Sequence, residues 1–480
     1  MTDSQVDQPD SQHGVNDPPA SLSLWDAVSI IVGIVVGVSI FKVPGLIFAN
    51  VSSPLEGLVA WGLGAVVAVC GTLTYAELAT LHRRTGGEYV YLSHAYGPCL
   101  GFLFGWAQLT GVFSGSIGTM AYVFADYAIV LLNWDASAGV GLALFSVLLL
   151  TTLHILGVKT STTVQNVLTL SKLIGLVMLL AVGLLADSNE SLTTEMPSGG
   201  GGFGLAMVFI LYAYGGWNDA AMVSAEIRDS KRNVPRSLLI GIGLISSIYL
   251  LVNFAYLQGL GFAGIRESGT PATDVIANST LLSPTIRGWS VQAIAVLVML
   301  SALGAVHGLI FTGSRLYAAL GSDHGLFEKL GRWHPRLGSP VWSLIAQASL
   351  TNLLIVTVGT ETGRNCVDTV VKSVGRDPVP WENFGGGFDT LLAATAPVFW
   401  AFFLLSGSTV FVFRFRQPHA DRPFRTPFYP VVPLVFIFSC VYMIYSSISY
   451  AGDLALLALI PLAAGLPIYL LSSHTTNQTQ

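Results

Sequence analysis

Apolar stretches long enough to span a lipid bilayer recur along almost all of this 480-residue chain. A helix crosses the hydrocarbon core with about 20 predominantly apolar residues. Inside the bilayer every backbone N–H and C=O must be paired within the protein, so such segments fold as helices. We count twelve of them, near residues 24–49, 55–81, 98–132, 138–156, 163–186, 203–225, 237–262, 289–319, 341–359, 389–413, 430–449 and 453–472. The sequence therefore predicts an all-α membrane protein with twelve transmembrane helices.

The small number of charged residues supports this class. They make up 10% of the chain, whereas hydrophobic residues make up 52%. Soluble domains carry about 25% charged residues, so this chain has too few to cover a water-facing surface. We expect a lipid bilayer around it and no nucleic-acid partner. We expect no disulfide framework, because most of the cysteines lie in or beside apolar segments: Cys70, Cys99, Cys366 and Cys440.

The distribution of lysine and arginine predicts the orientation. Alternate loops on the side of the termini hold fourteen of them, at Arg83, Arg84, Lys159, Arg228, Lys231, Arg232, Arg236, Lys329, Arg332, Arg336, Arg414, Arg416, Arg422 and Arg425. The opposite loops hold five, at Arg266, Arg287, Arg364, Lys372 and Arg376. Short loops rich in Lys and Arg stay in the cytoplasm, so we expect both termini there and a multi-pass protein of the plasma membrane.

The first and sixth segments contain glycines and polar residues at a depth where a continuous helix gains nothing from them. Gly33 and Gly37 interrupt the first, and Gly215-Gly216 interrupts the sixth. Gly33 and Gly37 alone would also fit a G-x-x-x-G packing face between straight helices. Paired interruptions at corresponding positions favour broken helices around a central binding site. The freed N–H groups suit a carboxylate and the freed carbonyls an ammonium, so the sequence indicates a zwitterion of the amino-acid type.

Several motifs then resemble the amino acid–polyamine–organocation superfamily, and within it the L-type amino acid transporter family. They are Tyr75-Ala76-Glu77-Leu78, Gly86-Gly87-Glu88-Tyr89-Val90-Tyr91, Leu211-Tyr212-Ala213-Tyr214-Gly215-Gly216-Trp217-Asn218, Arg232-Asn233-Val234-Pro235, Ser301-Ala302-Leu303-Gly304-Ala305-Val306-His307-Gly308 and Phe311-Thr312-Gly313-Ser314-Arg315-Leu316. Each is weak alone, and their order and spacing carry the resemblance.

The resemblance implies two inverted five-helix repeats with broken first and sixth helices, plus two further helices. The transporter domain would cover residues 23–472, with repeats over 24–186 and 203–413 and the extra helices over 430–472. We expect cytoplasmic tails over the remaining residues, 1–22 and 473–480, the first of them disordered and without a signal peptide.

The resemblance also assigns site residues. Backbone groups of Gly37, Val38, Ser39 and Ile40 would hold the substrate carboxylate, and carbonyls near Ile34, Val35 and Leu211 its amine. Tyr214 and Gly215 complete the predicted substrate site. Tyr212 matches a residue that gates the site from outside; an interfacial or core aromatic is the other interpretation. The family usually has Gly-Ser-Gly where this chain has Gly37-Val38-Ser39, so the substrate is not implied.

Lys172 lies near the middle of the fifth segment, where a charge must face the bundle interior and have partners. The resemblance implies that its ammonium occupies the place of a sodium ion in coupled relatives, between the backbone near Gly33 and the hydroxyl of Ser301. A purely structural lysine is the alternative. Lys42 either attracts anionic groups or extends to the outer interface. We expect Glu77 and Glu226 to contact loop Arg or Lys, and His307 to be structural.

The leading hypothesis is a sodium-independent amino-acid exchanger that works by alternating access. A proton-coupled amino-acid or polyamine permease and a non-transporting amino-acid sensor are the alternatives. No nucleophile motif, metal motif or P-loop occurs, so we expect no enzyme, no catalytic residue, no metal and no cofactor. The 133–138 loop lacks the cysteine that links light chains of this family to a heavy chain, so we expect no disulfide-linked heavy chain. We interpret residues 360–388 as a polar, exposed outer loop.

Overall fold

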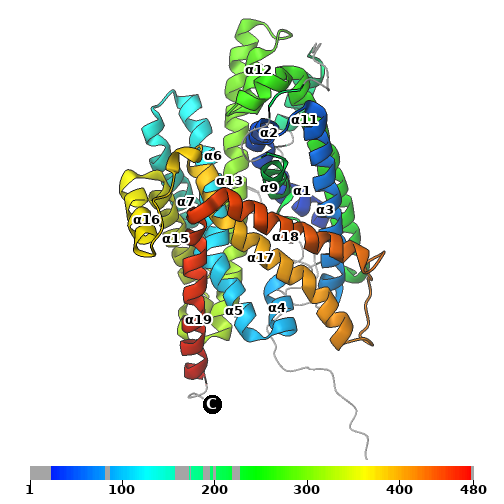
Figure 1. Ribbon diagram of the computed structural model, residues 1–480, viewed down its shortest axis with the longest axis vertical. Helices are drawn as coiled ribbons and strands as arrows, with labels where there is room; N and C mark the ends of the chain where they lie inside the picture. Colours follow the sequence, from blue (N-terminus) through cyan, green and yellow to red (C-terminus); the bar gives the residue numbers. More distant parts are fainter. Residues whose placement is uncertain are drawn as a thin grey trace, which may run out of the picture.

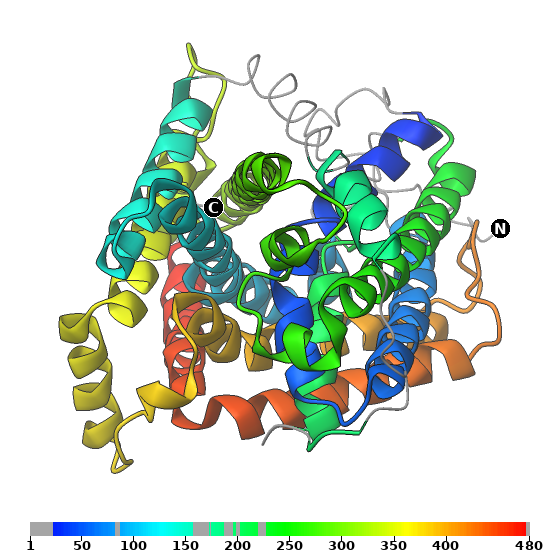
Figure 2. The same cartoon turned by 90° about the horizontal axis from the view of Figure 1, so that it is seen from above.

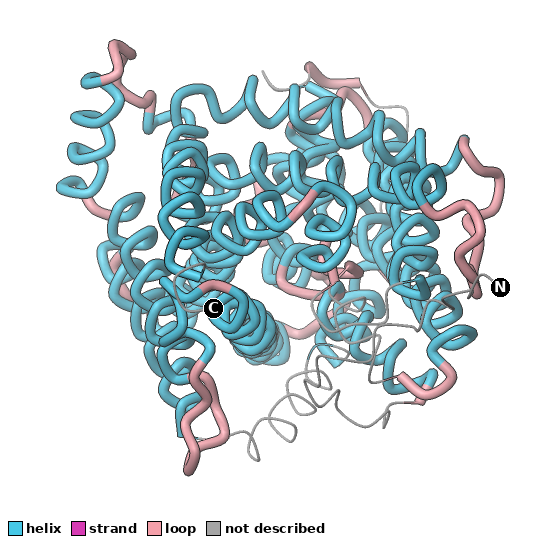
Figure 3. The backbone as a smooth tube through the Cα atoms, turned by 90° about the horizontal axis from the view of Figure 1, so that it is seen from below, coloured by secondary structure: helices cyan, strands magenta, loops and turns pink. Residues whose placement is uncertain are grey.

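The computed structural model describes residues 23–81, 87–156, 172, 174–186, 195–197, 202–218 and 227–476. Over these residues the chain consists of helices and loops without a strand (Figure 3). Eight helical stretches within them are long and apolar enough to cross a membrane: Pro54–Leu81, Pro98–Leu132, Ala136–Leu156, Ser230–Glu267, Pro284–Asp323, Val341–Gly359, Gly387–Arg416 and Val431–Ser472. The all-helical class is confirmed, and the count of twelve spans and the inverted repeats remain predictions.

The first and sixth predicted segments fold into shorter helices. The first is divided into α1 (Leu24–Val35) and α2 (Ser39–Ala49), and the sixth begins with α9 (Gly202–Tyr214), which ends in a turn over residues 215–218. α1 and α9 both end beside glycines that the sequence analysis singled out. Residues 163–171 and 173 of the fifth segment, the tail over residues 1–22 and Glu226 lie outside the described residues.

The other long helices overlap the predicted segments, and several short helices lie between them. They are α3 (Pro54–Leu81), α4 (Glu88–Tyr96), α5 (Pro98–Ala107), the π-helix η1 (Gln108–Val112), α6 (Phe113–Leu132), η2 (Ala136–Ala138), α7 (Gly139–Leu156), α11 (Ser230–Glu267), α12 (Pro271–Asn278), α13 (Pro284–Asp323), η4 (Gly325–Phe327), α14 (Glu328–Gly331), α15 (Val341–Gly359), α16 (Glu361–Ser373), η5 (Trp381–Asn383), α17 (Gly387–Arg416), α18 (Val431–Ala451), η6 (Gly452–Ala455) and α19 (Leu456–Thr476). The last of these continues into the predicted tail over 473–480.

The short helices lie inside the bundle of long ones. α1 packs on α11, α2 on α9 and α11, and α9 on α3. Figure 1 shows α1, α2 and α9 between α13 on one side and α3 and α11 on the other. Long helices thus shield the broken backbone from lipid, as unpaired peptide groups at that depth require.

The segment over residues 360–388 is mostly exposed, as its polar composition predicted, but it is not a loop throughout. It contains α16, which lies at the periphery of the molecule beside α15 (Figures 1 and 2). Val367 and Val371 are four residues apart on one helical face and are buried in a cluster with Leu454 of η6. Asp368 accepts hydrogen bonds from the Val379 N–H at 3.0 Å and the Trp381 indole N–H at 3.1 Å. A single apolar stripe therefore suffices to order a segment that is otherwise polar.

Glu77 makes the structural contacts that were predicted for it. Its carboxylate, 1% exposed, accepts two hydrogen bonds from the Arg414 guanidinium at 2.9 and 2.8 Å and one from the Thr426 N–H at 2.7 Å. Arg422 lies 3.5 Å away. The carboxylate thus joins α3 to the end of α17 and to the loop that follows it.

Glu77→Gln should lower the stability of the folded protein. The amide keeps the size of the side chain but leaves the Arg414 and Arg422 cations beside a neutral group, at a cost of about 1–3 kcal/mol. The measurement is the thermal melting temperature of the detergent-purified protein. Glu361→Gln, at an exposed position, is the matched control, and equal melting temperatures for the two variants would contradict a structural role of Glu77.

Candidate functional site

A cavity of about 140 Å³ lies at the two helix breaks. Its walls come from both breaks, the π-helix η1, α6, α13, α17 and the first residue of α4. The lining residues are Gly33, Val35, Gly37, Val38, Ser39, Glu88, Gln108, Val112, Phe113, Ser116, Met120, Tyr212, Ala213, Gly215, Gly216, Asn218, Gly304, Ala305, Gly308, Leu309, Thr312, Phe399 and Phe403. Two segments far apart in the sequence therefore meet where the sequence analysis placed a binding site.

The break between α1 and α2 presents backbone groups at the cavity wall. The last helical hydrogen bond of α1 runs from the Val36 N–H to the Val32 carbonyl at 2.8 Å. The Gly37 N–H then donates to the Val35 carbonyl at 2.6 Å. The helix resumes at Ser39. N–H groups in the first turn of a helix have no partner within that helix, and they carry the positive end of its dipole. Val38 and Ser39 place this turn at the cavity, where it can bind an anionic group.

Buried tyrosines bind carbonyls that lack a helical partner at the ends of α1 and α9 and in the first turn of α2. The Tyr249 hydroxyl lies 2.6 Å from the Val35 carbonyl and 3.0 Å from that of Ala213, so it touches the ends of both α1 and α9. The Tyr256 hydroxyl donates to the Ile40 carbonyl at 3.1 Å. That carbonyl lacks its usual helical partner because Pro44, four residues on, has no N–H. The carbonyls of Val35 and Ile40 are thus already bound by protein side chains.

Lys172 reaches the first break from the fifth segment. Its ammonium donates to the Gly33 carbonyl at 3.0 Å, and the side chain is 2% exposed. The predicted contact with the eighth segment is not made in this structure, since the buried Ser301 hydroxyl has no hydrogen-bond partner among the described residues. Lys172 therefore joins the first and fifth segments by a buried, charge-assisted hydrogen bond.

The predicted substrate residues divide into two groups. Val35, Gly37, Val38, Ser39, Tyr212 and Gly215 line the cavity, whereas Ile40, Leu211 and Tyr214 do not, and the Ile34 side chain lies outside the described part. Tyr214 points away, with its hydroxyl donating to the Trp61 carbonyl at 3.3 Å. Residues two apart on a helix point to nearly opposite sides, so Tyr212 and Tyr214 cannot both face one cavity.

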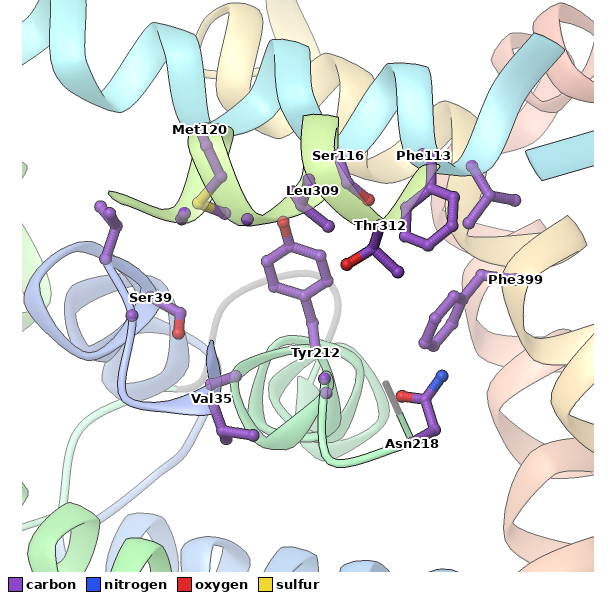
Figure 4. Close-up of a pocket in the computed structure, with 18 of the residues that line it drawn as sticks. Val35, Ser39, Phe113, Ser116, Met120, Tyr212, Asn218, Leu309, Thr312 and Phe399 are labelled. Atoms are coloured by element: carbon purple, nitrogen blue, oxygen red, sulfur yellow. The ribbon is translucent and has the colours of Figure 1, made fainter. Parts of the chain in front are cut away.

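Tyr212 extends into the cavity from α9, across from Leu309 and Thr312 of α13 (Figure 4). Its ring meets that of Phe388 edge to face, with centroids 6.3 Å apart. This position suits a gate, because one rotation of the side chain would change access to the cavity. The gating role stays a prediction.

The sequence analysis did not assign several polar residues that line the cavity. Glu88, Gln108, Ser116, Asn218 and Thr312 come from separate elements. Glu88 and Asn218 stood within the quoted motifs without a role. Gln108 starts a π-helical turn, a feature that is frequent at functional sites but has no sequence signature as clear as a glycine pair.

Two further charged or polar side chains have partners outside the cavity. Lys42 is partly buried and forms an ion pair with Asp126 of α6 at 3.2 Å, a partner that neither of its two interpretations included. His307 is buried and its ring lies against that of His154 of α7, with ring centroids 4.3 Å apart and the planes tilted by 37°. This contact between α13 and α7 agrees with the structural role predicted for His307.

Comparison with known proteins supports a transport function. A family model described as amino acid permease matches residues 22–470. The chain is 27% identical over 451 residues to the serine/threonine exchanger SteT of Bacillus subtilis (strain 168), covering 93% of this chain and 95% of that protein. It is 27% identical to the human b(0,+)-type amino acid transporter 1, covering 89% and 82%, and 24% identical to the human cystine/glutamate transporter, covering 89% and 80%.

Gly37→Leu should abolish substrate uptake without preventing folding. A leucine side chain at the break would occupy the space through which the backbone N–H groups reach the cavity, and we expect uptake to fall at least about tenfold. The measurement is uptake of labelled L-serine and L-alanine into liposomes. Gly62→Leu is the control, because a Cβ at Gly62 meets nothing within 4 Å. Normal uptake by folded Gly37→Leu protein would place the site elsewhere.

Proposed function

The chain belongs to the amino acid permease family, and on this premise we propose that it is a secondary active transporter that exchanges amino acids across the plasma membrane without sodium. The observation that carries the proposal is the cavity formed where two broken helices meet. The N–H groups of its α2 turn suit a carboxylate, and an ammonium would bind carbonyls of the breaks other than those that Lys172 and Tyr249 already bind. Those two groups are the part that all amino acids share.

We propose alternating access as the mechanism. One inverted repeat, over residues 24–186, would move against the other, over residues 203–413. The helices over 430–472 would lie outside the repeats, and both termini would lie in the cytoplasm. Tyr249 supports coupling between the halves, because its hydroxyl contacts the ends of both α1 and α9. A shift of either helix changes this contact.

The proposal of exchange draws on the relatives. The Bacillus protein is named a serine/threonine exchanger. An exchanger changes sides rapidly only when a substrate occupies its site, so that the free energy of binding drives the conformational change. For partners, we propose that the chain works without a disulfide-linked heavy chain, because the loop over residues 133–138 contains no cysteine.

Proton coupling is the alternative mechanism, and one pair of side chains in the structure bears on it. His154 and His307 form a buried pair, and a histidine pair can take up and release a proton. Neither side chain lines the cavity. The pair would therefore not contact a substrate in this cavity directly, and exchange is the mode that we propose.

Exchange predicts that uptake requires amino acid inside the vesicle. Purified protein in liposomes loaded with L-serine should take up labelled L-serine at least about tenfold faster than in empty liposomes, because an empty site would return slowly. The initial rate of uptake is the measurement, and protein-free liposomes are the control. Equal rates in loaded and empty liposomes would rule out obligatory exchange.

A permanently bound cation predicts sodium independence. Lys172 holds the Gly33 carbonyl with a cation that is covalently part of the chain and cannot leave with the substrate, so replacing sodium by choline should leave uptake by the native protein unchanged. Lys172→Ala should insert into the membrane at least as well, because it removes a buried charge, yet should slow uptake at least about fivefold by loosening the first break.

The test compares both proteins in both salts, with Lys231→Ala at a partly exposed surface ion pair as the control. Two results would contradict the role of Lys172: native uptake that collapses in choline, or full activity of the Lys172→Ala protein.

A further inference from the structure

A second hollow lies on the surface of the molecule. It is a groove of about 420 Å³ between the end of α6, the end of α12 and the first turns of α13. Among the described residues it shares no lining residue with the cavity at the helix breaks. Figure 1 shows α12 at the end of the molecule opposite the end of α19. The groove therefore lies on the side that we predict to face outward, where lysine and arginine are scarce.

The walls of this groove are mostly apolar. Val130 and Leu131 of α6 form one wall, and Ala277 of α12 borders it. The wall from α13 is one face of that helix, because its lining residues recur at intervals of three or four: Pro284, Gly288, Val291 and Ala295. Such walls suit a hydrocarbon chain.

The surroundings indicate that the groove opens toward lipid. Trp289, beside the lining residue Gly288, is 72% exposed, and Trp134, just after the end of α6, is 54% exposed. Exposed tryptophans of a membrane protein gather where the hydrocarbon core meets the lipid headgroups. A ligand in the groove would thus have one end at the headgroup level and the other along the hydrocarbon.

Arg287 supplies a positive charge to the groove wall. The side chain is half-buried, and its Nη2 donates to the Leu282 carbonyl at 3.2 Å. Its buried Nε has no partner among the described residues, and no carboxylate in that part of the chain forms an ion pair with it. A guanidinium has five N–H donors in a planar fork. The charge and several donors therefore remain for an anion.

A phospholipid matches this combination of groups. Its phosphate suits the guanidinium, which binds phosphate oxygens through charge-assisted hydrogen bonds, and its acyl chains suit the apolar walls. A zwitterionic headgroup would add an ammonium, and no carboxylate among the described lining residues is there to receive it. The charge of the groove thus favours a lipid whose headgroup is negative overall.

We propose that the groove binds an anionic phospholipid, with its phosphate on Arg287 and an acyl chain along Val130, Val291 and Ala295. This site goes beyond the proposed function, because its occupancy does not depend on transport. The lipid would contact α12 as well as α6 and α13. Since α12 also packs on α2, a bound lipid would brace a helix that contacts the outer half of the first break.

The test measures lipid binding to the delipidated, detergent-purified protein. Native mass spectrometry gives the apparent Kd of the first bound molecule of dioleoyl-phosphatidylglycerol or dioleoyl-phosphatidylcholine, which share their acyl chains and differ in headgroup charge. The native protein should bind phosphatidylglycerol at least about fivefold more tightly, as one arginine near a membrane surface supports. In Arg287→Gln this preference should fall below about twofold, whereas Lys372→Gln removes an exposed lysine from another loop predicted to face outward and should keep it.

A second variant tests the groove without changing its charge. A Cβ at Gly288 meets nothing within 4 Å, so Gly288→Leu should fold while its side chain fills part of the groove. Its affinity for phosphatidylglycerol should fall at least about fivefold, because the added side chain clashes with the lipid. Gly243→Leu on α11, where a Cβ is equally free, is the control and should keep the native affinity.

Three results would each overturn the site. They are equal affinity of the native protein for the two lipids, a preference that persists in Arg287→Gln, and an unchanged affinity for phosphatidylglycerol in Gly288→Leu.

Discussion

The structure depends on how it satisfies the peptide groups that two helix breaks leave unpaired in the membrane interior. Each such group costs several kcal/mol if it stays unpaired away from water. Tyr249 and Tyr256 donate to carbonyls of the breaks, and Lys172 donates to that of Gly33. These three donors come from elements outside the broken helices. The breaks are therefore stable only in the assembled bundle. A ligand can bind the peptide groups of the breaks that the tyrosines and the lysine do not bind.

The sequence predicted the breaks well because their cause is local. Glycine pairs and Pro44 are visible in the chain, and α15 begins and ends where the hydropathy placed the ninth segment. Side-chain direction was predicted less well. Tyr212 faces the cavity and Tyr214 faces Trp61, a difference that follows from the rotation of α9 in the bundle rather than from the motif both share. Glu88 stood in a quoted motif, but only the packing of α4 against the cavity gives it a possible role.

The errors have a common physical origin. Composition predicted a loop over residues 360–388, where the structure has the helix α16, whose Val367 and Val371 pack in a buried cluster with Leu454. Composition also left Lys42 between two interpretations, and the structure pairs it with Asp126, which lies 84 residues away in the sequence. Partners that are distant in the chain decide both cases. Local patterns give the element and its register, whereas tertiary contacts decide what a charged or polar face meets.

The proposed site divides substrate recognition between backbone groups and side chains. This division explains how unusual residues at the first break are compatible with binding of the amino-acid backbone. Val38 and Ser39 replace smaller or hydroxyl-bearing residues of the resembled family, yet the N–H groups of the α2 turn belong to the backbone and do not depend on either side chain. In the proposed function such donors bind the carboxylate that all amino acids share. Side chains from other elements, such as Asn218 of the α9 turn and Gln108 of η1, line the same cavity and are the candidates for discrimination between amino acids. Substitutions among these side chains would then change the substrate while the backbone donors of the first break stay in place.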